Sequence, residues 1–213
     1  MMSPSEATHS VTAALAAGYR AFDSAQWYDN ESAAGHAITS FLSSSPTLSR
    51  SSIFYTSKLR TNSTSYSSVR ASITASVRAS SLGYIDLFLL HSPYGGKTAR
   101  LTSWKAIEDA IDAGEVRSGG VSNYGVRHIE ELMESHPRIK PVVNQIEVHP
   151  FNTQEAIRGV CGKYEIVIEA YAPLARGMRF RHPVVVGLSE RYGCTLAQLM
   201  VRWVLPGGTM RVV

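Results

Sequence analysis

The strongest constraint on the fold of this chain is the regular alternation of short strand-like runs with helical patterns. The strand-like runs cover residues 19–22, 53–56, 84–90, 116–121, 142–148 and 166–170, with a last run that starts near Met210. Between them apolar residues recur at helical spacing, most clearly at Tyr66, Val69, Ile73 and Val77. Strands that alternate with helices in this way form βαβ units around a parallel sheet.

The pattern extends along the whole chain without a break that would separate two domains. Further helices are predicted around residues 8–17, 101–111, 126–133 and 196–203. Residues 84–90 are almost continuously apolar, which is typical of a strand that is covered on both faces. The serine-rich stretch 40–81 holds both a strand and a helix, so we expect it to be ordered. We therefore predict a single domain over residues 1–213.

Polar or aromatic side chains follow each predicted strand where it ends. In chain order they are Asp23, Lys58, His91, Ser122 with Asn123, then Gln145, Glu147 and His149, and finally Tyr171. Singly, each has an ordinary structural explanation, such as a turn acid, a solvated lysine head, a core histidine or a helix cap. In a closed barrel of parallel strands, however, these ends meet at one mouth, where catalytic residues gather. Their joint placement favours an active site.

Residues 18–31 carry the most specific motif and read GYRAFDSAQWYDNE. We expect a short buried strand that ends on Asp23, a loop with Trp27 and Tyr28, and then a helix capped by Asp29 or Asn30. The segment resembles the signature of the aldo-keto reductases, which are NADPH-dependent carbonyl reductases on a (β/α)8 barrel. The resemblance implies that Tyr28 is the proton donor, Lys58 the ammonium beside it, Asp23 the partner of Lys58, and His91 the group that orients the substrate carbonyl.

The chemistry of carbonyl reduction needs such a set. Hydride addition leaves an alkoxide, so a donor must supply a proton as negative charge develops. A tyrosine has an ordinary pKa near ~10, and a neighbouring ammonium favours its phenolate form. A carboxylate next to the ammonium keeps it charged and in place.

The same resemblance implies a cofactor site for NADPH. The segments 120–124 (GVSNY) and 144–150 (NQIEVHP) resemble those whose Ser, Asn and Gln side chains bind the nicotinamide carboxamide, here Ser122, Asn123 and Gln145. An amide suits this ligand because it offers donors and an acceptor together. Tyr171 corresponds to the aromatic residue on which the nicotinamide stacks. Glu147 and His149 are expected to be structural.

The chain is short for a complete barrel of this kind, which needs roughly 250 residues. When the predicted strands are numbered as in the family that the chain resembles, the 213 residues form an incomplete (β/α)8 TIM barrel. The first strand and the part after strand 8 are missing. The segment that holds the adenosine 2′-phosphate in the family, and a C-terminal substrate loop, belong to that later part. We expect substrate contacts from Trp27 and His91, and self-association through unpaired strand edges.

Composition and charge limit the kinds of partner that the protein can bind and the compartment in which we expect it. The net charge of +4, without a basic run, argues against nucleic acid and suits a small anionic ligand. No apolar run reaches the ~20 residues of a membrane span, and no secretory leader is seen, so we expect a cytoplasmic protein. Cys161 and Cys194 lack metal-type spacing and are predicted to be reduced core residues.

Two alternatives stay open. The chain could be catalytically inactive, either a partial product or a binding subunit that keeps the reductase motifs. It could also be a metal-dependent barrel hydrolase that uses Asp23, His91 and His149, although these residues lack ligand spacing and we expect no metal.

Overall fold

The computed structural model describes residues 2–205 and 210–212, the last three by their backbone alone. They divide into two compact units. The N-terminal unit comprises Met1–Ser122 and Glu131–Pro141, and the C-terminal unit comprises Asn123–Glu130 and Val142–Val213. All predicted strands and helices are present, with small shifts at their ends.

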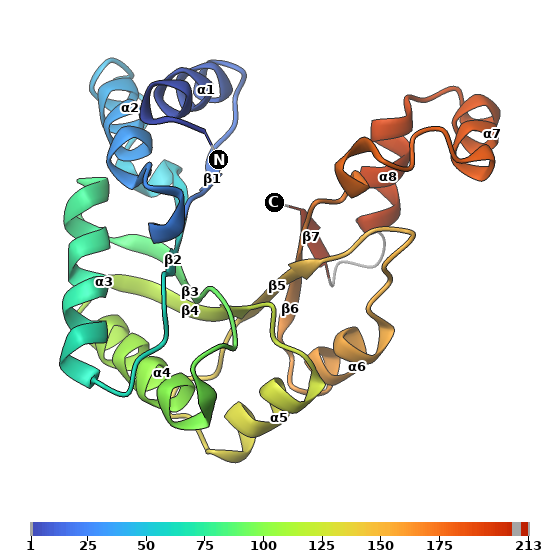
Figure 1. The fold of residues 1–213 in the computed structure, drawn as a ribbon. Coiled ribbons are helices and arrows are strands. Elements are labelled where there is room, and N and C mark those ends of the chain that lie inside the picture. Colours follow the sequence, from blue (N-terminus) through green and yellow to red (C-terminus); the bar gives the residue numbers. More distant parts are fainter. Residues whose placement is uncertain (1, 206–209, 213) are drawn as a thin grey trace. The chain divides into compact units, whose positions relative to one another are not determined.

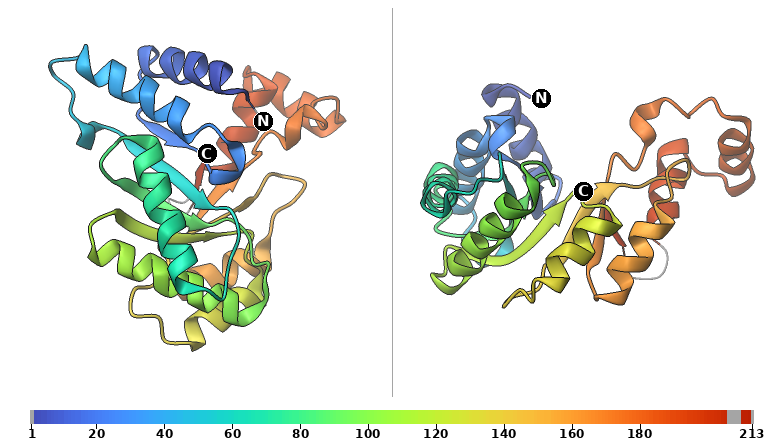
Figure 2. Two further views of the ribbon diagram at one scale, coloured as in Figure 1. Left: turned by 60° about the vertical axis from the view of Figure 1, so that its left-hand side comes forward. Right: turned by 60° about the horizontal axis from the view of Figure 1, so that its bottom comes forward.

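The N-terminal unit is built on four parallel strands, in the order β1 (Ala21–Asp23), β2 (Phe54–Leu59), β3 (Ile85–Leu90) and β4 (Val116–Ser122). Its helices lie on one side of these strands (Figures 1 and 2), α3 against β2 and α4 against β3 and β4. The helices are α1 (Pro4–Ala16), α2 (Glu31–Ser43), α3 (Tyr66–Ser80) and α4 (Gly96–Asp112). Because each connection is a parallel crossover, the carboxyl ends of β1, β2 and β3 share one edge.

The core of this unit matches the sequence pattern. Every residue of β3 is buried, as its continuous apolar run predicts. Helices α2 and α3 approach so closely that only glycine fits at Gly35, where a β-carbon would lie 1.9 Å from the carbonyl oxygen of Ser80.

Two expectations for the first motif were wrong. The first strand is not buried, because β1 lies at the edge of the sheet in its unit: Ala21 is exposed, and Tyr19 just before it is 65% exposed. Asn30 occupies the N-cap position of α2 but makes no capping bond. Its Oδ1 instead accepts a hydrogen bond of 2.8 Å from the Ser24 hydroxyl, which binds the loop to the start of the helix.

The C-terminal unit contains a second set of parallel strands, β5 (Val143–Glu147), β6 (Val167–Tyr171) and β7 (Met210–Val212), with β6 in the middle. Helix α6 (Glu155–Lys163) packs on β6, and α7 (Pro183–Tyr192) contacts α8 (Leu196–Val204). Helix α5 (Val126–Glu134) spans the boundary between the units.

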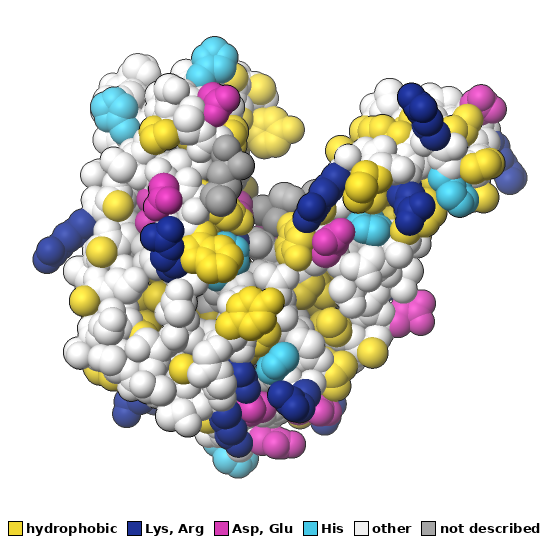
Figure 3. Space-filling model, in the orientation of Figure 1, with side chains coloured by type: hydrophobic (Ala, Val, Ile, Leu, Met, Phe, Trp, Pro, Cys, Tyr) yellow, Lys and Arg dark blue, Asp and Glu magenta, His cyan; other side chains and the backbone are white. Residues whose placement is uncertain are grey.

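The described residues also form three short 3₁₀ helices: η1 (Gln26–Tyr28), η2 (Arg50–Ser52) and η3 (Ala175–Gly177). Both cysteines are free, and Cys161 is buried. On the face shown in Figure 3, acidic side chains lie among the basic ones. Among the described residues, no helix combines the length and the apolar character needed to cross a membrane.

Candidate active site

The four residues predicted to act on the substrate all lie in the N-terminal unit, and the structure brings them together. Asp23 ends β1, Lys58 is the last residue but one of β2, and His91 directly follows β3. Tyr28 is the last residue of η1, in the loop after β1. Parallel pairing of β1 with β2 and of β2 with β3 places these strand ends at the same edge.

Lys58 is the centre of this group. Its side chain is fully buried, and its ammonium donates to the Asp23 carboxylate and, at 3.0 Å, to the carbonyl oxygen of Ser24. Removing an ammonium from water is costly unless it is paired, and these two acceptors compensate for the lost hydration. The same Nζ lies 5.0 Å from the centre of the Tyr28 ring, within the range of a cation–π contact.

His91 packs against both aromatic residues of η1. Its ring centre is 5.7 Å from that of Tyr28, nearly edge to face, and 5.4 Å from that of Trp27. Burial lowers the pKa of His91 to about 4, with a further lowering from the Lys58 charge and an opposing effect of Asp23. The imidazole is therefore neutral at pH 7 and carries one N–H donor and one acceptor nitrogen.

A cavity of about 480 Å³ opens beside these residues and is lined by Met2, Glu6, Asp23, Tyr28 and Asn30. Its size is within the usual range for small-molecule sites. The motif identified Asp23, Tyr28 and Asn30, whereas Met2 and Glu6 were not anticipated. No sequence signal marks them, because they reach the cavity only through the packing of α1.

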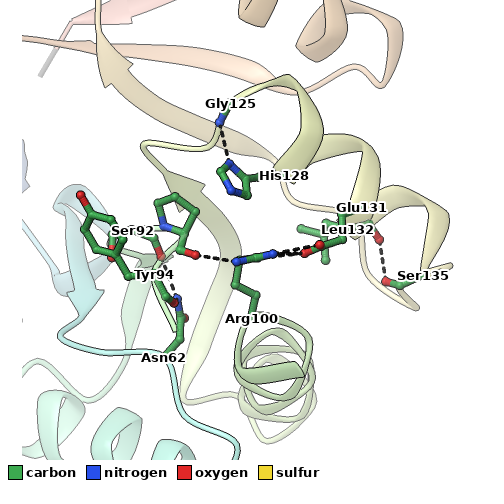
Figure 4. Close-up of polar contacts among 10 residues, drawn as sticks. Asn62, Ser92, Tyr94, Arg100, Gly125, His128, Glu131, Leu132 and Ser135 are labelled. Carbon is green, nitrogen blue, oxygen red and sulfur yellow. Dashed lines mark hydrogen bonds and ion pairs between the residues drawn. The ribbon is translucent and has the colours of Figure 1, made fainter. Parts of the chain in front are cut away.

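The loop that follows His91 is held by two buried side chains that sequence reasoning did not single out (Figure 4). Asn62 donates from Nδ2 to the carbonyl oxygens of Ser92 and Tyr94, each at 2.8 Å. Arg100 donates to the carbonyl oxygen of Pro93 at 2.7 Å and also pairs with Glu131. Three successive carbonyl groups are thus fixed directly after the candidate histidine.

Of the residues predicted to bind the cofactor, Ser122 is the buried last residue of β4 in the N-terminal unit. The other three lie together in the C-terminal unit. The Tyr171 hydroxyl donates to Asn123 Oδ1 at 2.9 Å, and the backbone N–H of Asn123 donates to the Gln145 carbonyl oxygen, also at 2.9 Å. Asn123 has a positive φ of 61°, which asparagine tolerates better than most residues.

Gln145 has a partner that was not predicted. Its Nε2 donates to Glu169 Oε2 at 2.7 Å, and this bond orients the amide. Glu169 lies two residues before Tyr171 on β6, so the strand period of two places both side chains on one face. This period-two alternation is the sequence signal that could have identified Glu169 as a residue of the site.

Glu147 and His149, which we expected to be structural, contact each other at 3.2 Å between Oε1 and Nε2. His149 Nδ1 also accepts from the backbone N–H of Phe151. In the described part of the chain, no cluster of three or more His, Cys, Asp and Glu residues could hold a metal ion.

Comparisons with known proteins agree with one another. Residues 1–213 match the aldo/keto reductase family. An uncharacterized oxidoreductase of Schizosaccharomyces pombe is 47% identical over 208 residues, which are 98% of this chain and 74% of that protein. The glyoxal reductase of Bacillus subtilis is 36% identical over 207 residues, 97% of this chain and 72% of that protein.

Solved structures show the same relationship. The aldo/keto reductase of Brucella melitensis superimposes with a TM-score of 0.90 at 34% identity, over 99% of this chain and 79% of that one. The aldose reductase of Schistosoma japonicum gives 0.89 at 31% identity, over 99% of this chain and 75% of that one. These matches confirm the predicted fold class, an incomplete (β/α)8 barrel of the α/β type. The chain belongs to the aldo/keto reductase family.

Proposed function

We propose that this protein reduces an aldehyde or a ketone to an alcohol with NADPH as the hydride donor. The observation that carries the proposal is the arrangement of Lys58: it is buried, paired with Asp23, and placed over the ring of Tyr28. Family membership and the oxidoreductase relatives support the same reaction class.

In the proposed reaction, Tyr28 is the proton donor. Hydride addition to the carbonyl carbon breaks the π bond and leaves negative charge on the oxygen. The Tyr28 hydroxyl gives its proton to that oxygen, and the tyrosinate later regains a proton from water. The Lys58 ammonium stabilises the tyrosinate while it exists, and Asp23 holds the ammonium in place.

His91 has the protonation state needed to orient the substrate. Because its ring is neutral at pH 7, it can donate one N–H hydrogen bond to a carbonyl oxygen without giving up its proton. Trp27, which is 44% exposed and packs against His91, provides an apolar surface for the substrate beside it.

We further propose that Ser122, Asn123, Gln145 and Tyr171 bind the nicotinamide. Asparagine and glutamine amides offer both donors and acceptors, which suits a carboxamide, and the Tyr171 ring offers a stacking face. When bound, the nicotinamide supplies the hydride. The phosphorylated form, NADPH, is proposed from the family resemblance. A single partial barrel domain over residues 1–213 is proposed from the unbroken alternation of strands and helices, and a place in the cytoplasm from the two free cysteines.

Replacing Tyr28 with phenylalanine tests the proposal. Y28F removes only the hydroxyl, so we expect carbonyl turnover to be lost while saturable quenching of tryptophan fluorescence by NADPH persists. Tyr19→Phe is the matched control, since Tyr19 is 65% exposed at the start of the same motif, and its turnover should be unchanged.

Unchanged turnover in Y28F would refute the assigned role. Absence of turnover and of NADPH binding in the folded, unmodified protein would favour the inactive-chain alternative. Size-exclusion chromatography of the same sample tests for self-association through strand edges, which we propose from the edge position of β1.

A further inference from the structure

The side chain of Gln26 makes a complete set of hydrogen bonds two residues before Tyr28. Its Nε2 donates to the Ser72 carbonyl oxygen at 3.0 Å and to the Ser76 hydroxyl at 2.8 Å. Its Oε1 accepts from the Arg60 backbone N–H at 2.7 Å and from the Ser72 hydroxyl at 3.1 Å. Two donor and two acceptor bonds use the full capacity of a primary amide.

These bonds join three separate parts of the N-terminal unit. Gln26 is the first residue of η1, Ser72 and Ser76 lie on α3, and Arg60 directly follows β2. A 3₁₀ helix of three residues has little stability of its own, and the N-cap of η1 lacks a side-chain capping bond. The position of η1 therefore depends on bonds to its surroundings.

A further carboxyl group, that of Glu31, lies between the Gln26 bonds and the strand that carries Lys58. Glu31 accepts from the Ser57 hydroxyl at 2.5 Å, and the Ser76 hydroxyl, which accepts from Gln26, lowers the pKa of Glu31. Ser57 and Ser76 are both fully buried, and burial raises the pKa of Glu31. Ser57 precedes Lys58 on β2, so the Glu31 carboxyl lies close both to the bonds of Gln26 and to the strand that carries Lys58.

We infer that Gln26 is a positioning residue that fixes η1, and with it the Tyr28 ring, at its distance from Lys58 and His91. The inference rests on the proposed function for its catalytic consequence, but the geometric claim concerns η1 alone. A purely structural role would predict something different: loss of the amide would lower the stability of the whole protein without changing the rate of the molecules that remain folded.

The test compares Gln26→Met, which keeps the length of the side chain and loses all four bonds, with Gln198→Met. Gln198 caps the start of α8, where its Oε1 accepts from the Thr195 backbone N–H. Ser76→Ala is the milder variant: it removes only the bond that Gln26 Nε2 donates to the Ser76 hydroxyl, so it preserves a readout if the methionine variant does not fold.

Two quantities are measured on each folded variant. The first is kcat and KM for a carbonyl substrate between about pH 6 and 9, which is the span in which histidine and cysteine side chains ordinarily titrate. The second is the constant for quenching of Trp27 fluorescence by acrylamide. Trp27 is the middle residue of η1, and its signal is isolated by subtracting the fluorescence of the same protein carrying W27F.

We expect Gln26→Met to lower kcat by at least about 10-fold and up to about 100-fold, because misplacing a reacting group by about 1 Å has effects of this size. KM should change far less, the Trp27 quenching constant should rise, and the effects of Ser76→Ala should fall in between. Gln198→Met should leave both kcat and the quenching constant of Trp27 unchanged.

An unaltered Trp27 quenching constant in Gln26→Met would overturn the inference, whatever happens to the rate. An unaltered kcat in an active enzyme would overturn it as well. If the unmodified protein has no turnover, the proposed function fails by itself, and the quenching comparison still decides whether Gln26 holds η1 in place.

Discussion

The ammonium of Lys58 lies 5.0 Å from the centre of the Tyr28 ring, and it is fully buried at that position. Asp23 compensates for its charge from the end of the neighbouring strand. We expect Lys58→Met to abolish turnover, because the tyrosinate would lose its stabilising cation. It should also destabilise the fold. Breaking a buried ion pair typically costs about 3–5 kcal/mol, and we expect a smaller loss here because 17% of the Asp23 side-chain surface is exposed.

The double variant with Lys58→Met and Asp23→Asn separates these two effects. It removes the unpaired carboxylate, so stability measured by urea unfolding should recover while turnover remains absent. A double variant that is less stable than Lys58→Met alone would contradict this account of the pair.

His91 should make the protein less stable in acid. Its pKa is lowered from 6.5 to about 4 in the folded state, so between these values the unfolded chain binds more protons than the folded one. Stability therefore falls as the pH decreases from about 6.5 towards about 4. Denaturant unfolding across this range, with and without His91→Gln, isolates the contribution of this residue.

An NMR titration of the His91 ring checks the pKa directly. No titration step of this ring is expected between pH 6 and 8, and a midpoint near neutral pH would refute the neutral hydrogen-bond donor. His9→Gln, at an exposed histidine on α1, is the control for the substitution itself.

The ion pair between Arg100 and Glu131 should be important for stability. Arg100 donates from Nε and Nη2 to the carboxylate over 2.6–2.9 Å, and it also holds the Pro93 carbonyl. Glu131→Gln leaves a buried guanidinium without its counter-ion, which typically costs about 3–5 kcal/mol. Urea unfolding provides the measurement.

The exposed pair of Arg138 and Asp112 is the matched control for that prediction. It is 2.8 Å long, but both side chains are more than half exposed. Asp112→Asn should therefore change the free energy of unfolding by no more than about 1 kcal/mol. Equal losses in the two variants would show that burial does not set the strength of these pairs.

Gly35 should tolerate no larger residue. The β-carbon of Gly35→Ala would lie 1.9 Å from the Ser80 carbonyl oxygen, so α2 and α3 would have to separate. We expect a loss of more than about 3 kcal/mol, at or above the upper end for overpacking. Thermal unfolding compared with Gly159→Ala tests this.

Gly159 lies in α6 with open space around it. Alanine there should stabilise the helix by up to about 1 kcal/mol, because glycine is the weaker helix former. A destabilised Gly159→Ala protein would mean that helix propensity does not explain the difference.

Much of the fold could be predicted because its signals are local. The continuous apolar run at residues 84–90 became a strand that is buried throughout, and the helical spacing from Tyr66 to Val77 became α3. The first strand was less predictable. Its aromatic residues suggested burial, but its place at the edge of the sheet leaves Ala21 exposed, and edge position is not encoded in a three-residue segment.

By itself, the sequence determined the order of strands and helices and the motif with Asp23 and Tyr28, because periodicity and short motifs depend on residues close together in the chain. It singled out Lys58 and His91 because each stands at the end of a later predicted strand. Only the tertiary structure decided that the Asn30 side chain meets Ser24 instead of capping α2, that Glu169 orients Gln145, and that α3 and the Arg60 backbone together saturate the Gln26 amide. The physical reason is distance along the chain: Gln26 and Ser76 are 50 residues apart, and their hydrogen bond exists only once the helix has packed beside the loop.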